Sequence, residues 1–288
     1  MVVAKTDDIL RAKVIANIRG RIRSGLYTSR ETGMKPLKIY IGVDPKEMVT
    51  FHVLSHSIMA RASGPVSITP LYLPNIRGLY DRPRDAGQST EFTYSRFLTP
   101  WLAGPEVSIF MDSDMLCLSN VYDLERMAME QPYSDVLVVK HDYKPKLEKK
   151  FLNQPQSEYP CKNWSSLMVF NGHRLAVRYL TPEYINRASP MDLHQFKWAR
   201  AVGEIPAEWN HLVGEYDPRL DAKLVHYTLG APCFRKYQHC EYAGEWFEEL
   251  GRMTSCRDPD TEGSYHADLC GHPAEGSAGP PEPDGSSL

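Results

Sequence analysis

The chain has 288 residues, of which 42% are hydrophobic and 24% are charged, and its formal net charge is -3 at pH 7. This composition is typical of a globular protein and excludes a chain that is disordered throughout. The small negative charge supplies no general positive field, which argues against nucleic-acid binding as the main activity. An anionic ligand would have to be held locally, by a metal ion or a few Arg and Lys side chains.

The N-terminal segment 1–36 predicts an amphipathic, basic helix followed by a linker. Residues 6–24 carry aliphatic side chains at helical spacing, namely Ile9, Leu10, Val14, Ile15 and Ile18. Gly33 and Pro36 then interrupt the pattern. The segment has no apolar run long enough for a signal peptide or a transmembrane segment, and we therefore expect a cytoplasmic protein.

Residues 37–254 predict one catalytic domain of the α/β class. Helical periodicity over 48–63 and 91–102 alternates with short apolar runs typical of strands at 37–44, 66–73, 107–118, 134–143, 165–173 and 222–230. Pro100 is expected to end or kink the second helix. Strands that alternate with helices predict a mostly parallel sheet flanked by helices, with its ligand site beyond the carboxyl ends of the strands.

The C-terminal segment 255–288 is rich in Gly, Pro, Ser and acidic residues. It has too little apolar surface to offset the entropy lost on ordering, and we predict a disordered tail. The six cysteines contain no CxxC pair and are expected to be free, mostly structural thiols. A Cys/His metal site among Cys233, Cys240, Cys256, Cys270 and the histidines near them stays open as an alternative, although its spacing is irregular.

The sharpest motif is an apolar strand that ends in Asp112-Ser113-Asp114. Carboxylate oxygens at a strand end can hold a hard divalent cation such as Mn2+ or Mg2+, which in turn can bind a diphosphate. The same pattern also occurs in plain turns, but its place after a βα unit favours a metal site. A later apolar run ends in His226, and a neutral imidazole is a suitable third ligand if the two strands are neighbours.

Taken in order, these motifs resemble glycosyltransferase family 8 and related bacterial sequences of the GT-A fold, over roughly residues 37–250. The resemblance is carried by the following residues, in chain order: Val43-Asp44, Tyr94-Ser95-Arg96-Phe97, Asp112-Ser113-Asp114, the strand from Ser165 to Asn171, His194-Gln195, and His226-Tyr227 with Gly230. It implies a Rossmann-like GT-A domain that transfers a sugar from a nucleoside diphosphate donor to an acceptor. That acceptor, whether a glycan, a lipid or a protein, is not identified by the sequence.

The resemblance also implies a role for each matching residue. Asp112, Asp114 and His226 would ligate Mn2+ or Mg2+, and Gln195 would lie at the anomeric carbon as the catalytic residue. Donor-binding roles fall on Asp44 at the base, Arg96 at the acid pair or the phosphates, Ser113, Asn163 and Gly230. Alternatives stay open for three of these: Asp44 as a helix N-cap, Arg96 in a surface salt bridge, and Gln195 as a solvated helix residue.

The sequence departs from the family pattern at three places. Asn163-Trp164-Ser165-Ser166 replaces Asn-Ala-Gly, so that the sugar contact falls on Asn163 or its neighbour, and His194 replaces the acidic residue before the glutamine. Gly230 lies one position later than expected and no phosphate-binding Lys follows it, which leaves Arg235 or Lys236 as substitutes.

The sequence favours a retaining reaction. A retaining enzyme needs no strong general base beside Gln195, whereas an inverting one needs a carboxylate such as Asp192, Glu208 or Glu215. Two other functions remain open, a HAD-like phosphatase with the acid pair as nucleophile and partner, and a sugar-nucleotide-binding protein without turnover. The phosphatase fold usually carries its pair on the first strand, whereas here the pair comes later.

Overall fold

The computed structural model describes residues 35–85, 88–142, 149–150, 154–155, 160–257 and 264–266. Nearly all of the predicted N-terminal helix and linker, and most of the predicted tail, lie outside these ranges. Within the described residues no helix is both long and apolar enough to cross a membrane. Cys117, Cys161, Cys233 and Cys240 are free thiols, as the sequence predicts.

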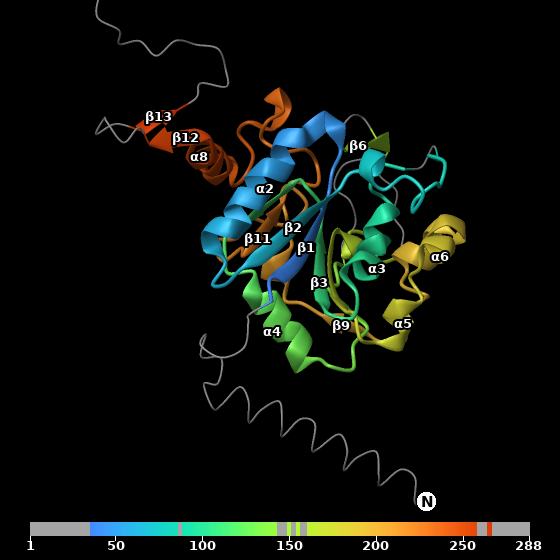
Figure 1. Cartoon of the computed structure of the whole chain (residues 1–288). Coiled ribbons are helices and arrows are strands. Elements are labelled where there is room, and N and C mark those ends of the chain that lie inside the picture. Colours follow the sequence, from blue (N-terminus) through green and yellow to red (C-terminus); the bar gives the residue numbers. More distant parts are fainter. Residues whose placement is uncertain are drawn as a thin grey trace, which may run out of the picture.

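The described residues form a six-stranded main sheet whose strands, in spatial order, are β2 (Val66–Leu71), β1 (Leu37–Gly42), β3 (Val107–Met111), β8 (Leu167–Asn171), β5 (Val136–Val138) and β9 (Val202–Glu204) (Figure 1). β8 runs antiparallel to both of its neighbours, and the other strands are parallel. The predicted mostly parallel α/β sheet is therefore confirmed.

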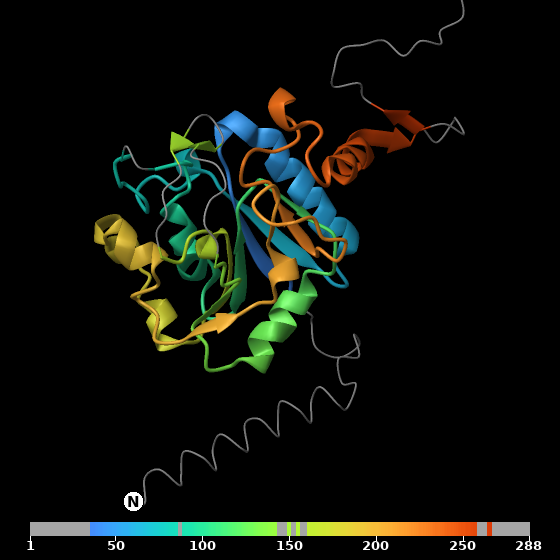
Figure 2. The same cartoon turned by 180° about the vertical axis from the view of Figure 1, so that it is seen from behind.

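Helices cover both faces of this sheet, because its strands are apolar on both sides. On one face, α2 (Met48–Arg61) and α4 (Tyr122–Glu130) pack against Ile39 and Ile41 of β1. On the other face, Tyr40 and Phe110 pack against a group of shorter helices (Figures 1 and 2), namely η3 (Ser95–Leu98), α3 (Thr99–Ala103), α5 (Leu175–Arg178), α6 (Pro182–Arg187) and α7 (Pro190–His194).

Two predicted elements are divided in the structure. The predicted helix at 91–102 becomes η3 and α3, and Pro100 lies in the first turn of α3 instead of ending it. A proline fits there because its missing N–H would have no helical partner at that position. The predicted strand 107–118 becomes β3 and β4 (Met115–Cys117), since the chain turns at the acid pair.

β4 belongs to a second sheet of three strands, in the order β10 (His211–Leu212), β11 (Leu224–His226) and β4. β11 runs antiparallel to β4 and places His226 opposite Met115, directly after the acid pair. Register alone therefore brings His226 beside Asp114, although the two residues are far apart in the sequence.

The last helix, α8 (Ala243–Thr254), packs against α2 beside this second sheet (Figure 2). Trp246 of α8 lies in a cluster with Val53 of α2 and Val225 of β11. Glu249 is buried and binds two side chains of α2, with Oε1 at 2.5 Å from His56 Nδ1 and Oε2 at 2.8 Å from Arg61 Nη1. An apolar cluster and the contacts of the buried Glu249 carboxyl group thus join α8 to α2.

The remaining elements are short. They are η1 (Pro45–Glu47), η2 (Leu73–Asn75), β6 (Lys149–Lys150), β7 (Gln154–Pro155), η5 (Trp164–Ser166), η6 (Ala207–Trp209), η7 (Arg235–Tyr237), β12 (Ser255–Arg257) and β13 (Ser264–His266). β12 and β13 pair with each other and lie inside the segment 255–288 that the composition predicts to be disordered.

Candidate active site

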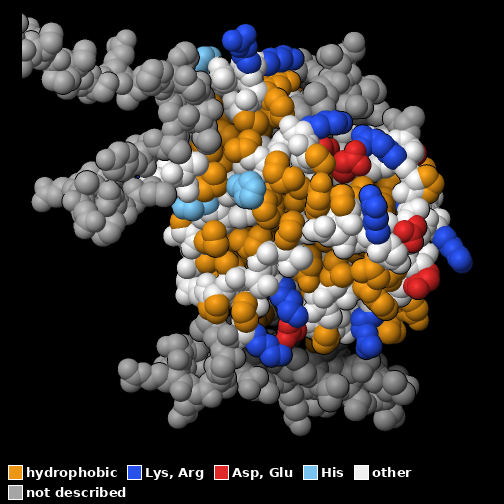
Figure 3. Space-filling model, turned by 45° about the horizontal axis from the view of Figure 1, so that its top comes forward, with side chains coloured by type: hydrophobic (Ala, Val, Ile, Leu, Met, Phe, Trp, Pro, Cys, Tyr) orange, Lys and Arg blue, Asp and Glu red, His pale blue; other side chains and the backbone are white. Residues whose placement is uncertain are grey.

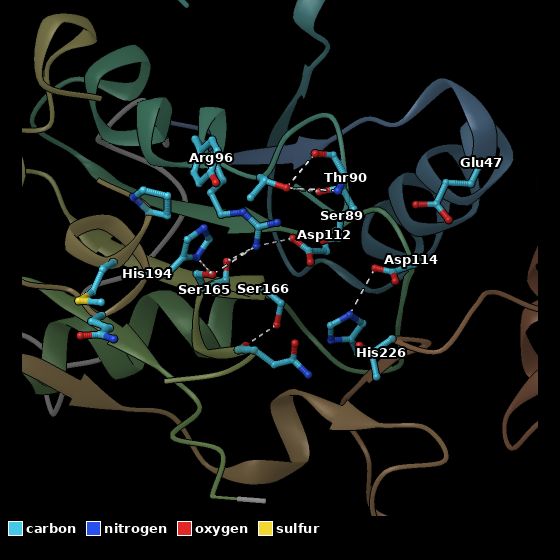
Figure 4. A pocket seen from close by; sticks show the side chains of 17 residues that line it. Glu47, Ser89, Thr90, Arg96, Asp112, Asp114, Ser165, Ser166, His194 and His226 are labelled. Atoms are coloured by element: carbon cyan, nitrogen blue, oxygen red, sulfur yellow. Dashed lines mark hydrogen bonds and ion pairs between the residues drawn. The ribbon is translucent and has the colours of Figure 1, made fainter. Parts of the chain in front are cut away.

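A cavity of about 330 Å³ opens at the carboxyl ends of β1 and β3, where a ligand site is expected in an α/β sheet (Figure 4). It is lined by six of the nine residues that the sequence assigns to the site: Arg96, Asp112, Asn163, Asp114, Gln195 and His226. The structure therefore brings together residues that are separated by up to 130 positions in the sequence.

Asp112, Asp114 and His226 form one compact group in this cavity. Their ligand atoms all lie within 4.8 Å of one another, and His226 Nε2 is 3.4 Å from Asp114 Oδ1. Of the acidic, His and Cys side chains in the described residues, these three are the ones that lie close enough together to hold a metal ion. Two carboxylates and an imidazole are a donor set that fits Mn2+ and also accepts Mg2+.

A buried amide, Asn210, fixes the orientation of the His226 ring. Ser166 Oγ donates its only proton to the carbonyl oxygen of Asn163. In its contact with Asn210 Nδ2, at 2.8 Å, the Ser166 hydroxyl is therefore the acceptor. The Asn210 Oδ1 atom then accepts from His226 Nδ1 at 3.0 Å. Because Nδ1 carries the proton, the Nε2 lone pair faces the acid pair and is available to a cation. Nothing in the sequence pattern identifies Asn210, which follows η6.

Arg96 provides the positive charge at the acid pair that the sequence predicts. Its Nη1 atom lies 3.0 Å from Asp112 Oδ1 and donates to the Ser165 carbonyl at 2.9 Å. The side chain is buried, and its guanidinium lies near the rings of Phe92 and Phe110. Since a buried guanidinium held by these neighbours cannot move freely, Arg96 holds Asp112 in position and places a cation at the cavity wall.

The opposite wall of the cavity comes from short helices and turns. Gln195 directly follows α7 and lines the cavity with Met191. Its neighbour His194 binds Ser165 Oγ through Nδ1 at 2.9 Å and lies between the rings of Tyr94 and Phe97. Burial, and then the nearby charges of Arg96 and Arg82, lower the pKa of His194 to about 3, so its imidazole is neutral at physiological pH.

Three predicted donor-binding residues do not line this cavity. Asp44 caps η1 by accepting from the Lys46 backbone N–H at 3.1 Å, and its second oxygen lies 3.4 Å from the backbone nitrogen of Glu91. Ser113 is buried between the two acids. Gly230 has a φ of +143°, and a Cβ atom there would overlap the ring of Tyr237. Asp44 is thus an N-cap, although of η1, the short helix directly before α2, and not of α2 itself.

The three carboxylates considered as a general base also lie outside the lining of this cavity. Asp192 pairs with Lys197 Nζ at 3.2 Å, and Glu208 pairs with Lys223 Nζ at 3.5 Å. Glu215 is buried. The cavity therefore presents Gln195, and none of the three candidate bases, on the wall away from the metal group.

Several residues that line the cavity are given no role by the sequence, and the acidic one among them is Glu47. Glu47 ends η1, three positions after Asp44, and its side chain is buried and faces the cavity (Figure 4). Burial raises its pKa well above the usual range, and the neighbouring charges of Asp114, Asp44 and Asp112 raise it further, while a hydrogen bond with Ser113 opposes the shift. In the sequence, only its position three residues after Asp44 indicates that Glu47 lies near the site.

The molecular face above the carboxyl end of β1 is shown in Figure 3. Hydrophobic side chains occupy the middle of this face, and charged side chains of both signs lie around its edge.

No model of a known protein family matches the chain. Protein CDI of Arabidopsis thaliana is 38% identical over 241 residues, which cover 80% of this chain and 92% of that protein. Among solved structures, the galactosyltransferase LgtC in complex with donor and acceptor sugar analogs has a TM-score of 0.50 at 13% identity, over 77% of this chain and 98% of LgtC. The glycosyltransferase GlyE of Streptococcus pneumoniae TIGR4 also gives 0.50, at 10% identity, over 75% of this chain and 60% of GlyE. These likenesses establish that the chain has the GT-A fold.

Proposed function

The chain belongs to the family of Protein CDI of Arabidopsis thaliana, and we propose that it is a metal-dependent glycosyltransferase with a nucleoside diphosphate sugar as its donor. The observation that carries this proposal is the convergence of Asp112, Asp114 and His226 at the strand ends of a GT-A domain. The acceptor, a glycan, a lipid or a protein, remains to be identified.

The residues of the cavity fit the demands of this reaction. The transfer expels a nucleoside diphosphate, so negative charge develops on the leaving group and has to be neutralised. A bound Mn2+ or Mg2+ would supply Lewis-acid stabilisation of that charge. Asp112, Asp114 and His226 would hold the ion, and Arg96 keeps Asp112 oriented at 3.0 Å.

Gln195 is the proposed catalytic residue on the sugar side. An amide side chain is neutral and can donate to or accept from a sugar hydroxyl, or lie against the reacting face, without acting as a strong base. The carboxylates that an inverting reaction would use, Asp192, Glu208 and Glu215, do not line the cavity. This supports transfer with retention of configuration. The donor-binding roles of Asn163, Ser113, Gly230 and Asp44 stay predictions.

A HAD-like phosphatase is less well supported. The acid pair follows β3, the third strand in chain order, whereas that alternative usually carries its pair on the first strand. Asp112 is also engaged by Arg96, and an aspartate that serves as a nucleophile has to reach a phosphorus atom. A binding protein without turnover would have the same cavity as a transferase, and only a measured rate of donor turnover separates the two.

Donor hydrolysis tests the proposal directly. The chain is incubated with a panel of nucleoside diphosphate sugars with Mn2+ and with EDTA, and release of the nucleoside diphosphate is measured. We expect slow release from one donor class in Mn2+ and none in EDTA. Metal-dependent binding without release would favour a binding protein. Hydrolysis of p-nitrophenyl phosphate that Asp112→Asn abolishes would favour the phosphatase.

A further inference from the structure

Glu47 has an environment that a structural role does not explain. The residue is 5% exposed, and although Ser113 hydrogen-bonds its side chain, the charged groups that act on it, Asp114, Asp44 and Asp112, are all acidic. No ion pair joins it to a Lys or Arg among the described residues. Burial of a carboxyl group costs free energy unless it is paired, and nearby like charges add to that cost. Such an arrangement weakens the fold, and side chains of this kind cluster at functional sites.

Glu47 lies near the acid pair but is not one of the three side chains of the metal group. The three ligand atoms of Asp112, Asp114 and His226 cluster within 4.8 Å without it. In Figure 4 Glu47 lies at one end of the cavity and His194 at the other, with the acid pair between them. A cavity of about 330 Å³ that extends to both sides of a metal site can hold an elongated ligand that crosses the metal.

The donor assigned under the proposed function has its parts in a fixed covalent order: sugar, diphosphate and ribose with its base. The proposed site puts the sugar at Gln195 and the diphosphate at the metal, so the ribose falls at the Glu47 end. We infer that the Glu47 carboxyl group accepts hydrogen bonds from the ribose 2′- and 3′-hydroxyls of the donor. Carboxylates bind the ribose 2′-hydroxyl in the same way at the strand ends of dinucleotide-binding domains.

This inference rests on the proposed function, and a binding cycle tests the two separately. UDP, GDP, ADP and CDP are titrated into the chain with Mn2+ by calorimetry, and the tightest is then compared with its 2′-deoxy and 3′-deoxy forms. We expect loss of a hydroxyl to weaken binding to the parent chain by roughly twofold to tenfold, the effect of removing one ordinary hydrogen bond. Glu47→Ala should bind the ribose and deoxyribose forms equally well.

Glu208→Gln is the matched control, because Glu208 lies outside the cavity and pairs with Lys223. It should keep the full discrimination between ribose and deoxyribose. Thermal melting of Glu47→Gln without ligand separates a binding role from a structural one: a binding role predicts an unchanged or higher melting temperature, since the variant removes a buried carboxyl group. A lower melting temperature with unchanged discrimination would overturn the inference.

The two hypotheses fail in different ways. If no nucleoside diphosphate binds the parent chain in Mn2+, the proposed function is wrong and the role of Glu47 falls with it. If the parent binds one of them but Glu47→Ala still distinguishes ribose from deoxyribose, only the role of Glu47 is wrong.

Discussion

Two parts of the cavity are built in different ways: the metal group between its two ends, called the metal end below, and the wall that carries Gln195, called the opposite end. At the metal end, Asp112, Asp114 and His226 lie at the ends of β3, β4 and β11, and strand register brings them together. At the opposite end, Gln195 and Asn163 lie in turns beside helices of three to five residues, and Asn163 has a left-handed φ of 61°. Strand pairing tolerates little displacement, whereas turns depend on many separate contacts. We therefore expect the metal end to be preformed and the other end to adjust to its ligand.

The largest effect should follow from removing one acid of the metal end. Asp114→Ala should weaken Mn2+ binding by roughly 100-fold or more, because even residues that only support a ligand contribute 10- to 100-fold to metal affinity. Calorimetric titration of Mn2+ measures this, and circular dichroism checks that the fold is kept. Unchanged Mn2+ affinity would refute the metal site and remove the basis of the comparison.

His226 is expected to complete the metal group in preference to the C-terminal cysteines and histidines. His226→Ala should weaken Mn2+ binding far more than Cys240→Ser, because the imidazole Nε2 atom faces Asp114 at 3.4 Å. Electron paramagnetic resonance of bound Mn2+ reports the change. An equal loss of Mn2+ binding in the two variants would contradict His226 as the third ligand and favour one from the C-terminal region.

At the opposite end, Gln195→Ala should lower kcat by roughly 10- to 100-fold while Mn2+ affinity stays unchanged, since Gln195 lines the cavity away from the metal group. Steady-state kinetics with the best donor, together with a Mn2+ titration, separates the two effects. A loss of Mn2+ affinity in this variant would show that the two ends are not independent.

A smaller effect concerns pH and stability. The pKa of His194 is lowered to about 3 in the folded chain, below its usual value, so the unfolded chain binds more protons between about pH 3 and pH 6.5. His194 therefore lowers stability as the pH falls through this window, by about 1.4 kcal/mol per pH unit. Urea unfolding of His194→Gln should show a flatter dependence on pH, and an unchanged slope would contradict the shift.

The smallest effect is expected outside the cavity. Removing residues from 257 onward should leave donor hydrolysis and thermal stability nearly unchanged, because that segment has few apolar side chains to pack. A fall of several degrees in the melting temperature would show that the segment docks on the domain.

The grouping of Asp112, Asp114 and His226 can be predicted from the sequence because its evidence is local. An apolar run that ends in an acid or an imidazole indicates both the end of a strand and a candidate ligand. The mostly parallel sheet followed from the same alternation of strands and helices. The resemblance to known sequences supplied Arg96, whose ion pair with Asp112 is present.

The rest could not be predicted because it depends on contacts between distant segments. Asn210 orients His226 only once β11 lies beside η6, and Glu47 joins the acids only once η1 reaches the cavity. The division of segment 107–118 between two sheets likewise depends on β11 pairing with β4. Patterns of apolar spacing carry no information on such partners.

The buried network between Glu249 and α2 has a consequence for synthesis of the chain. Arg61 and His56 lie 188 and 193 residues before Glu249 in the sequence. The ribosome has therefore made most of the domain before these two side chains can contact Glu249. Until then, the part of α2 that faces α8 has no cover, and exposed apolar surface promotes aggregation. Contacts of such long range also slow folding. The domain is thus expected to fold as a single cooperative unit after translation, and to need chaperones while α8 is still missing.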